Sequence, residues 1–223
     1  MAISDKLVDR LNIKPSDLVI DIGSNDGTIL QGFKNKGIRV LGVEPTNIAN
    51  VATQNGIDTI NEFFNEEVAK KIQYAYGKAS LIIGANVFAH VASLGSLLRG
   101  INLLLKENGV FLNESHYLMD ILDAVQYDSI YHEHLRFYSI KSMKRLMQYY
   151  KLNVYDVEKI PNYGGSIRCY SQKGTSHFET DELKRLETLE TTLNINDLQS
   201  FEIFKNRTEQ SKIELMALLY SIK

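Results

Sequence analysis

The 223-residue chain has no tryptophan, three prolines and a single cysteine, Cys169. One cysteine excludes an internal disulfide framework and any zinc site built from several cysteines. Neither charge sign dominates, because 25 Lys and Arg residues stand against 27 Asp and Glu residues, which gives a formal net charge of −2. A near-neutral chain lacks the electrostatic footprint for a phosphate backbone, so we expect no nucleic-acid partner.

Long hydrophobic runs are also missing. None approaches the roughly 20 residues that a membrane-spanning helix needs, and residues 1–6 lack the basic-then-apolar profile of a signal peptide. Hydrophobic side chains make up 44% of the chain and charged ones 23%, which is ordinary for a globular protein. We therefore expect a cytoplasmic protein with no membrane partner.

Short apolar runs alternate with helix-length amphipathic stretches through the first half of the chain, at residues 18–20, 38–43, 57–60, 81–85 and 110–112. This alternation is typical of buried parallel strands joined by crossover helices. Two later strand-like stretches, residues 153–158 and 166–171, are separated by a short turn and should pair antiparallel. The sequence predicts an α/β fold: a doubly wound, Rossmann-like sheet, mostly parallel, with an antiparallel closing hairpin and C-terminal helices.

The C-terminal part carries apolar stripes at helical spacing, around Leu183 to Leu193 and from Leu198 to Ile222. Such stripes most often pack, either on the sheet or on a partner chain. We therefore assign residues 1–176 to a catalytic domain and residues 177–223 to a helical extension through which two chains could form a homodimer.

A glycine-containing turn, Asp21-Ile-Gly-Ser-Asn-Asp-Gly27, follows the first expected strand. Ligands of open parallel sheets bind at the carboxyl ends of the strands, and glycines let the backbone approach them closely. Glu44 ends the second expected strand, where a carboxylate can accept hydrogen bonds from both hydroxyls of a ribose. The spacing departs from the Gly-x-Gly-x-x-Gly of dinucleotide sites, and its acidic side chains suit the ammonium and sulfonium groups of S-adenosylmethionine. We predict S-adenosylmethionine rather than a nicotinamide dinucleotide as the cofactor, held by Asp21, Gly23, Ser24, Asn25, Gly27 and Glu44.

Four of the five histidines follow expected strand ends: His90, His116, His132 and His134. Histidine exchanges protons near neutral pH, a neighbouring carboxylate can orient it, and a tyrosine hydroxyl can stabilise a developing oxyanion. A catalytic or substrate-binding role is therefore our main interpretation. A metal site at His132 and His134 is the alternative, along with a purely structural role, but no further ligand is evident and we predict no metal.

Five segments, taken together, resemble the C-methyltransferases of deoxysugar biosynthesis, which methylate a nucleotide-linked 4-keto sugar at C3. They are residues 21–27, 42–45, 86–90, 131–134 and 164–168. Tyr131-His-Glu-His134 followed by Gly164-Gly-Ser-Ile-Arg168 is the most specific part. The resemblance implies a class I methyltransferase sheet over nearly the whole chain.

The resemblance also implies roles for individual residues. His134 would be the general base, Tyr131 and Glu133 would assist it, and His90 would lie beside the sugar. Phe63 and Asn86 would join the contacts to the methyl donor. For the small-molecule acceptor we expect contacts from His116, Tyr117, His132 and Arg168.

Members of that family usually begin with a zinc-binding domain and end with a second α/β domain, and we expect both to be absent from this chain. In that family both of these domains help to hold a nucleotide-sugar. The sequence therefore defines the methyl transfer more closely than the identity of the acceptor. C-methylation next to a ketone of a sugar-type acceptor is the first hypothesis. O-methylation of a carbohydrate hydroxyl is the second, and a non-catalytic module that binds the donor or a partner is the third.

Overall fold

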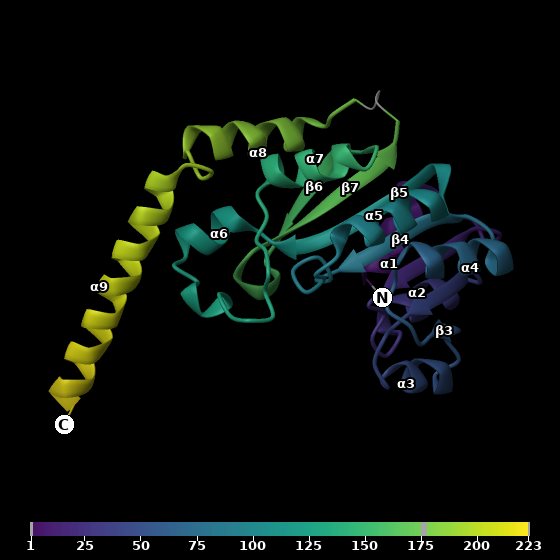
Figure 1. Cartoon of the computed structure of the whole chain (residues 1–223), viewed down its shortest axis with the longest axis horizontal. Helices are drawn as coiled ribbons and strands as arrows, with labels where there is room; N and C mark the ends of the chain where they lie inside the picture. The colour runs from purple at the N-terminus through teal and green to yellow at the C-terminus, as the bar shows by residue number, and fades with distance from the viewer. Residues whose placement is uncertain (1, 175–177, 223) are drawn as a thin grey trace.

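The computed structural model describes residues 2–174 and 178–222 and is built on a seven-stranded sheet ordered β3-β2-β1-β4-β5-β7-β6 (Figure 1). Strands β1 to β5 are paired in parallel, and β7 lies antiparallel between β5 and β6. The strands are β1 (Leu18–Ile22), β2 (Arg39–Val43), β3 (Thr59–Ile60), β4 (Ala79–Ala85), β5 (Leu105–His116), β6 (Leu152–Ile160) and β7 (Ser166–Lys173). This arrangement confirms the predicted mostly parallel sheet with an antiparallel closing hairpin.

Helices cover both faces of the sheet because its buried strands alternate apolar side chains between two cores. In β1, Ile20 belongs to the larger core cluster, whereas Val19 belongs to the smaller one. The larger cluster includes residues of α4, α5, α7 and α8, and the smaller one includes residues of α1 and α2. The helices are α1 (Ala2–Leu11), α2 (Thr28–Lys34), α3 (Ala49–Gln54), α4 (Glu66–Tyr76), α5 (Leu94–Leu104), α6 (Leu118–Asp123), α7 (Ile140–Tyr149), α8 (Asp181–Thr192) and α9 (Leu198–Ile222).

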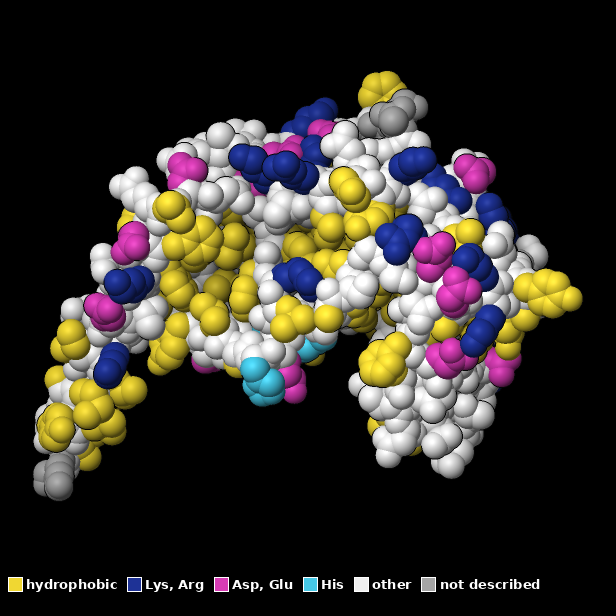
Figure 2. Space-filling model, in the orientation of Figure 1, with side chains coloured by type: hydrophobic (Ala, Val, Ile, Leu, Met, Phe, Trp, Pro, Cys, Tyr) yellow, Lys and Arg dark blue, Asp and Glu magenta, His cyan; other side chains and the backbone are white. Residues whose placement is uncertain are grey.

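The two C-terminal helices differ in how they pack. Helix α8 lies against β6 and α7 and buries Leu183 and Leu186, as its apolar stripe predicts. Helix α9 projects away from the body and buries no side chain, and Arg207 anchors it by donating to the carbonyl oxygens of Leu122 (3.0 Å) and Asp123 (2.7 Å) in α6 (Figure 1). Hydrophobic side chains remain on its surface (Figure 2). Pairing of two chains through α9 stays a prediction.

The predicted boundary between residues 176 and 177 lies outside the described residues. None of the helices in the described part of the chain combines the length and the hydrophobicity needed to span a membrane.

Candidate active site

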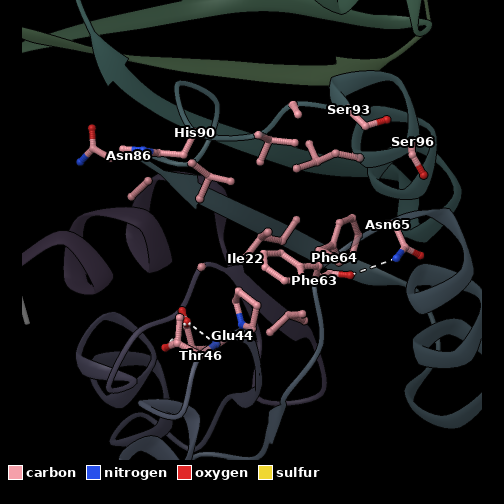
Figure 3. A pocket seen from close by; sticks show the side chains of 18 residues that line it. Ile22, Glu44, Thr46, Phe63, Phe64, Asn65, Asn86, His90, Ser93 and Ser96 are labelled. Carbon is pink, nitrogen blue, oxygen red and sulfur yellow. Dashed lines mark hydrogen bonds between the residues drawn. The ribbon is translucent and has the colours of Figure 1, made fainter. Parts of the chain in front are cut away.

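A cavity of about 700 Å³ opens at the carboxyl ends of the parallel strands; we call it the strand-end cavity (Figure 3). Glu44 lies on one side of it, His90 and Asn86 lie on another, and the rings of Phe63 and Phe64 line a third (Figure 3). The volume falls in the range of pockets that hold small ligands and cofactors, roughly 300–1,000 Å³.

Glu44 is buried at the end of β2, and its carboxylate is held by three donors. The backbone N–H of Asn25 donates to one oxygen (3.1 Å), while the N–H (3.0 Å) and hydroxyl (2.7 Å) of Thr46 donate to the other. These bonds fix the carboxylate at the cavity wall and leave one acceptor position for a ligand, since two carboxylate oxygens offer about four such positions. Thr46 lines the cavity as well but is absent from the predicted residues. Its position two residues after a strand-end carboxylate is the signal that could have identified it.

The turn from Gly23 to Gly27 brings the backbone to the cavity edge. Gly23 has a φ of 71°, and a Cβ atom there would lie 2.8 Å from the Val87 side chain. Gly27 has a φ of 83°, and its Cβ would lie 2.9 Å from Ile57. Both positions therefore require glycine.

Four of the eight residues predicted to hold the methyl donor line the strand-end cavity: Gly23, Glu44, Phe63 and Asn86. The other four, Asp21, Ser24, Asn25 and Gly27, belong to the end of β1 and the turn after it and are not among the lining residues. Within the described residues, Asp21 Oδ1 and the Ser24 hydroxyl are buried without a hydrogen-bond partner. Burial, followed by the negative charge of Glu44, raises the pKa of Asp21 to about 8.

His90, His116 and His134 lie together beside the strand-end cavity, with Tyr131 and Tyr163; these five residues form what we call the histidine cluster. The ring of His134 lies 5.0 Å from His90 and 5.1 Å from His116, measured between centroids. His90 also lines the strand-end cavity, so the two features are continuous. The N–H of Leu135 donates to the Ala89 carbonyl (2.8 Å), which joins the two loops that carry His134 and His90.

The segment Tyr131-His-Glu-His134 forms a turn and not a strand. The N–H of His134 donates to the carbonyl of Tyr131 (3.1 Å), and the two rings lie 4.4 Å apart. The two residues between them point outward: the side chain of His132 is 89% exposed and that of Glu133 is 58% exposed. The turn therefore does not place His132 and His134 on one face, as two ligands spaced two residues apart in a strand would lie.

Hydrogen bonds at both ring nitrogens of His134 fix its tautomer. Nδ1 lies 2.8 Å from the carbonyl oxygen of Ser129, which can only accept, so Nδ1 carries the proton. Nε2 is then the unprotonated nitrogen, and it lies 3.3 Å from the hydroxyl of Tyr131. The orienting role expected of Glu133 belongs in this structure to the Ser129 carbonyl.

His116 is half-buried at the end of β5. Burial, and then the nearby His134 and His90, lower its pKa, while Glu114 opposes the shift. His116 is thus neutral at physiological pH. The ring of Tyr163 contacts the His116 ring at a centroid distance of 5.4 Å.

Two further predicted acceptor contacts do not face the histidine cluster. Tyr117 is fully buried, and its hydroxyl donates to Glu190 (3.0 Å). Assigning Tyr117 to the acceptor was wrong, because a strand-end position does not determine which way the side chain points. Arg168 donates to the buried carboxylate of Glu114 (2.8 Å), which lies in β5, the strand that carries His116.

Among residues 2–174 and 178–222, no three His, Cys, Asp or Glu side chains converge as a metal-binding group. The buried Cys169 has its pKa raised to about 12 by burial, which leaves it an unreactive thiol.

The strand order, the glycine turn and the cavity next to a strand-end carboxylate define a class I S-adenosylmethionine-dependent methyltransferase fold. The chain belongs to the methyltransferase-domain family, which it matches over residues 2–157, and residues 161–223 match the C-methyltransferase C-terminal domain. These matches confirm the predicted enzyme class and its cofactor.

A curated relative, the C-methyltransferase NovU of Streptomyces niveus, is 36% identical over 176 residues, which are 78% of this chain and 42% of that protein. The chain thus spans less than half of that relative's length. Among solved structures, the PH0226 protein of Pyrococcus horikoshii OT3 superposes with a TM-score of 0.61 at 15% identity, covering 77% of this chain and 88% of that one. Magnesium protoporphyrin IX methyltransferase of Synechocystis PCC 6803, solved with bound SAH, gives a TM-score of 0.58 at 12% identity, covering 78% and 80%. At such identities the likeness concerns the fold.

Proposed function

We propose that this chain transfers a methyl group from S-adenosylmethionine to the carbon next to the ketone of a sugar-type acceptor, with His134 as the general base. The observation that carries the proposal is the fixed tautomer of His134. Its Nε2 is unprotonated and lies in a cluster continuous with the strand-end cavity. The similarity to a C-methyltransferase supports carbon as the methylated atom.

The strand-end cavity fits the donor. Glu44 would accept a hydrogen bond from a ribose hydroxyl, and the rings of Phe63 and Phe64 would contact the adenine on one side of the ribose. Asn86 and His90 would then lie at the methionine end, beside the histidine cluster. When bound, S-adenosylmethionine supplies an electrophilic methyl group on a sulfonium.

His134 would remove the proton from the carbon next to the ketone. The electron pair of the C–H bond stays on the acceptor as an enolate, the nucleophile that takes the methyl group, while Nε2 keeps the proton. The Ser129 carbonyl accepts from Nδ1 and keeps the ring in place through this step. The Tyr131 hydroxyl, freed from Nε2 by the acceptor, can donate to the enolate oxygen. The partly exposed His134 then returns its proton to water.

The test uses a donor whose methyl group is labelled with carbon-13 and two acceptors, a nucleotide-linked 4-keto deoxysugar and its 4-hydroxy analogue. We expect the ketone to gain a methyl group bonded to carbon and the hydroxy analogue to stay unmodified. Carbon–proton correlation spectra of the product locate the new bond. A methyl group on oxygen would replace C-methylation by O-methylation, and no mass gain on either acceptor would favour a binding module.

A further inference from the structure

The turn between β6 and β7 has an unusual backbone. Tyr163 has a φ of 52° and a ψ of 36°, in the left-handed region that favours glycine. Gly164 and Gly165 follow with φ of 78° and 134°, so three successive residues have positive φ. An aromatic residue in this conformation persists only where surrounding contacts hold the chain in place.

Hydrogen bonds from three directions hold the turn. Within it, the N–H of Gly165 and the hydroxyl of Ser166 both donate to the Asn162 carbonyl, each at 3.0 Å. From β5, Glu114 accepts a hydrogen bond from the Asn162 side chain (3.1 Å). From the loop that leads to Tyr131, Gln126 donates to the Gly164 carbonyl (2.8 Å). The turn is thus tied both to the strand that carries His116 and to the loop that carries His134.

The Tyr163 ring does not pack into the hydrophobic core. It is 67% exposed, and its ring contact is with His116, at 5.4 Å between centroids. A left-handed backbone, fixed from three sides, therefore presents an exposed aromatic ring at the rim of the histidine cluster. Such a ring offers a flat apolar face next to the proposed base, and sugar rings present C–H groups that pack on a face of this kind.

We propose that Tyr163 is an acceptor-positioning residue whose ring forms the outer wall of the acceptor site and packs against the sugar ring. This inference rests on the proposed function. With the sugar packed on the exposed face of the Tyr163 ring, the carbon next to its ketone would face Nε2 of His134. The ring contributes its face, and the hydroxyl of Tyr163 is dispensable.

The test compares Tyr163→Ala, Tyr163→Gly and Tyr163→Phe with the unmodified chain, using the nucleotide-linked 4-keto deoxysugar. Loss of the ring should raise the acceptor KM by about 5- to 10-fold in the Ala and Gly variants, with kcat within about 3-fold and donor affinity unchanged. Tyr163→Phe should keep the unmodified KM. Tyr74→Ala, which removes an exposed tyrosine from α4, is the matched control and should change nothing.

Thermal unfolding separates this role from a structural one. Glycine adopts a φ of 52° without strain, so Tyr163→Gly should unfold at the same temperature as the unmodified chain or above it, yet share the KM defect of Tyr163→Ala. An unchanged KM in folded Tyr163→Gly, with an active unmodified chain, would overturn the inference and leave the proposed function intact. If the unmodified chain methylates no sugar, the proposed function fails, and this inference fails with it.

Discussion

Replacing Asp21 by asparagine should change how the stability of the protein depends on pH. Asp21 lies near the carboxyl end of β1, 2% exposed, and within the described residues its Oδ1 atom has no hydrogen-bond partner. Burial, followed by the negative charge of Glu44, raises its pKa from 3.8 to about 8. The folded protein therefore keeps this carboxyl protonated at neutral pH, whereas the unfolded chain releases the proton.

Proton linkage determines the direction and the size of this pH dependence of stability. A raised pKa contributes stability that is fully present below about pH 4 and is lost as the pH rises through about 8. Between those limits the folded state holds one more proton, so Asp21 lowers the free energy of unfolding by about 1.4 kcal/mol per pH unit. Asparagine has nearly the same shape and does not titrate. The stability of the unmodified chain relative to Asp21→Asn should fall by about 3 kcal/mol from pH 5 to pH 7.

Urea unfolding of both proteins at several pH values measures this difference directly. Asp197→Asn, which alters an exposed carboxylate, is the control and should track the unmodified chain. A difference between the unmodified chain and Asp21→Asn that stays flat from pH 5 to pH 7, or rises, would refute a neutral, desolvated Asp21.

Three further outcomes are expected. Glu44→Ala should weaken donor binding by on the order of 1.5–3 kcal/mol, because a charge-assisted ribose hydrogen bond is lost; unchanged affinity in calorimetry would remove Glu44 from the site. Treatment with a chelator should leave turnover intact, since proton abstraction by histidine needs no Lewis acid; activity that returns only with added metal would contradict this. Glu190→Ala should lower the free energy of unfolding by about 2–4 kcal/mol, because it leaves the Tyr117 hydroxyl and the N–H groups of Ile140 and Lys141 unpaired; a loss below about 0.5 kcal/mol in urea unfolding would count against it.

Much of the fold could be predicted from hydrophobic patterning, because buried parallel strands must be apolar on both faces. The runs near Leu18 and Leu81 became β1 and β4, and the antiparallel hairpin followed from two strand patterns with a short turn between them. Strand β5 extends from Leu105 to His116, well beyond the run predicted at residues 110–112. Its first half includes exposed polar residues beside a register shift, and these leave no hydrophobic pattern.

A strand-end position indicated where Glu44 would lie, whereas Phe63 and Asn86, which also line the cavity, were expected from the resemblance. The direction of a side chain could not be predicted in the same way. Tyr117 was therefore assigned to the acceptor, although its hydroxyl donates to Glu190. The orienting group of His134 is a backbone carbonyl, and any residue type at position 129 would carry one. Tyr163 was missed for a related reason, because a left-handed aromatic residue depends on distant hydrogen bonds.

Hydrogen exchange at the acceptor tests the role of His134 most directly, because it observes proton removal without methyl transfer. The nucleotide-linked 4-keto deoxysugar is incubated in heavy water with the protein and S-adenosylhomocysteine, and loss of the proton next to the ketone is followed by nuclear magnetic resonance. The unmodified chain should catalyse this exchange, and His134→Asn should slow it by about 10²- to 10⁴-fold, the usual contribution of a general base. Exchange at the full rate in His134→Asn, together with its loss in His90→Asn, would contradict the assignment of His134 as the base.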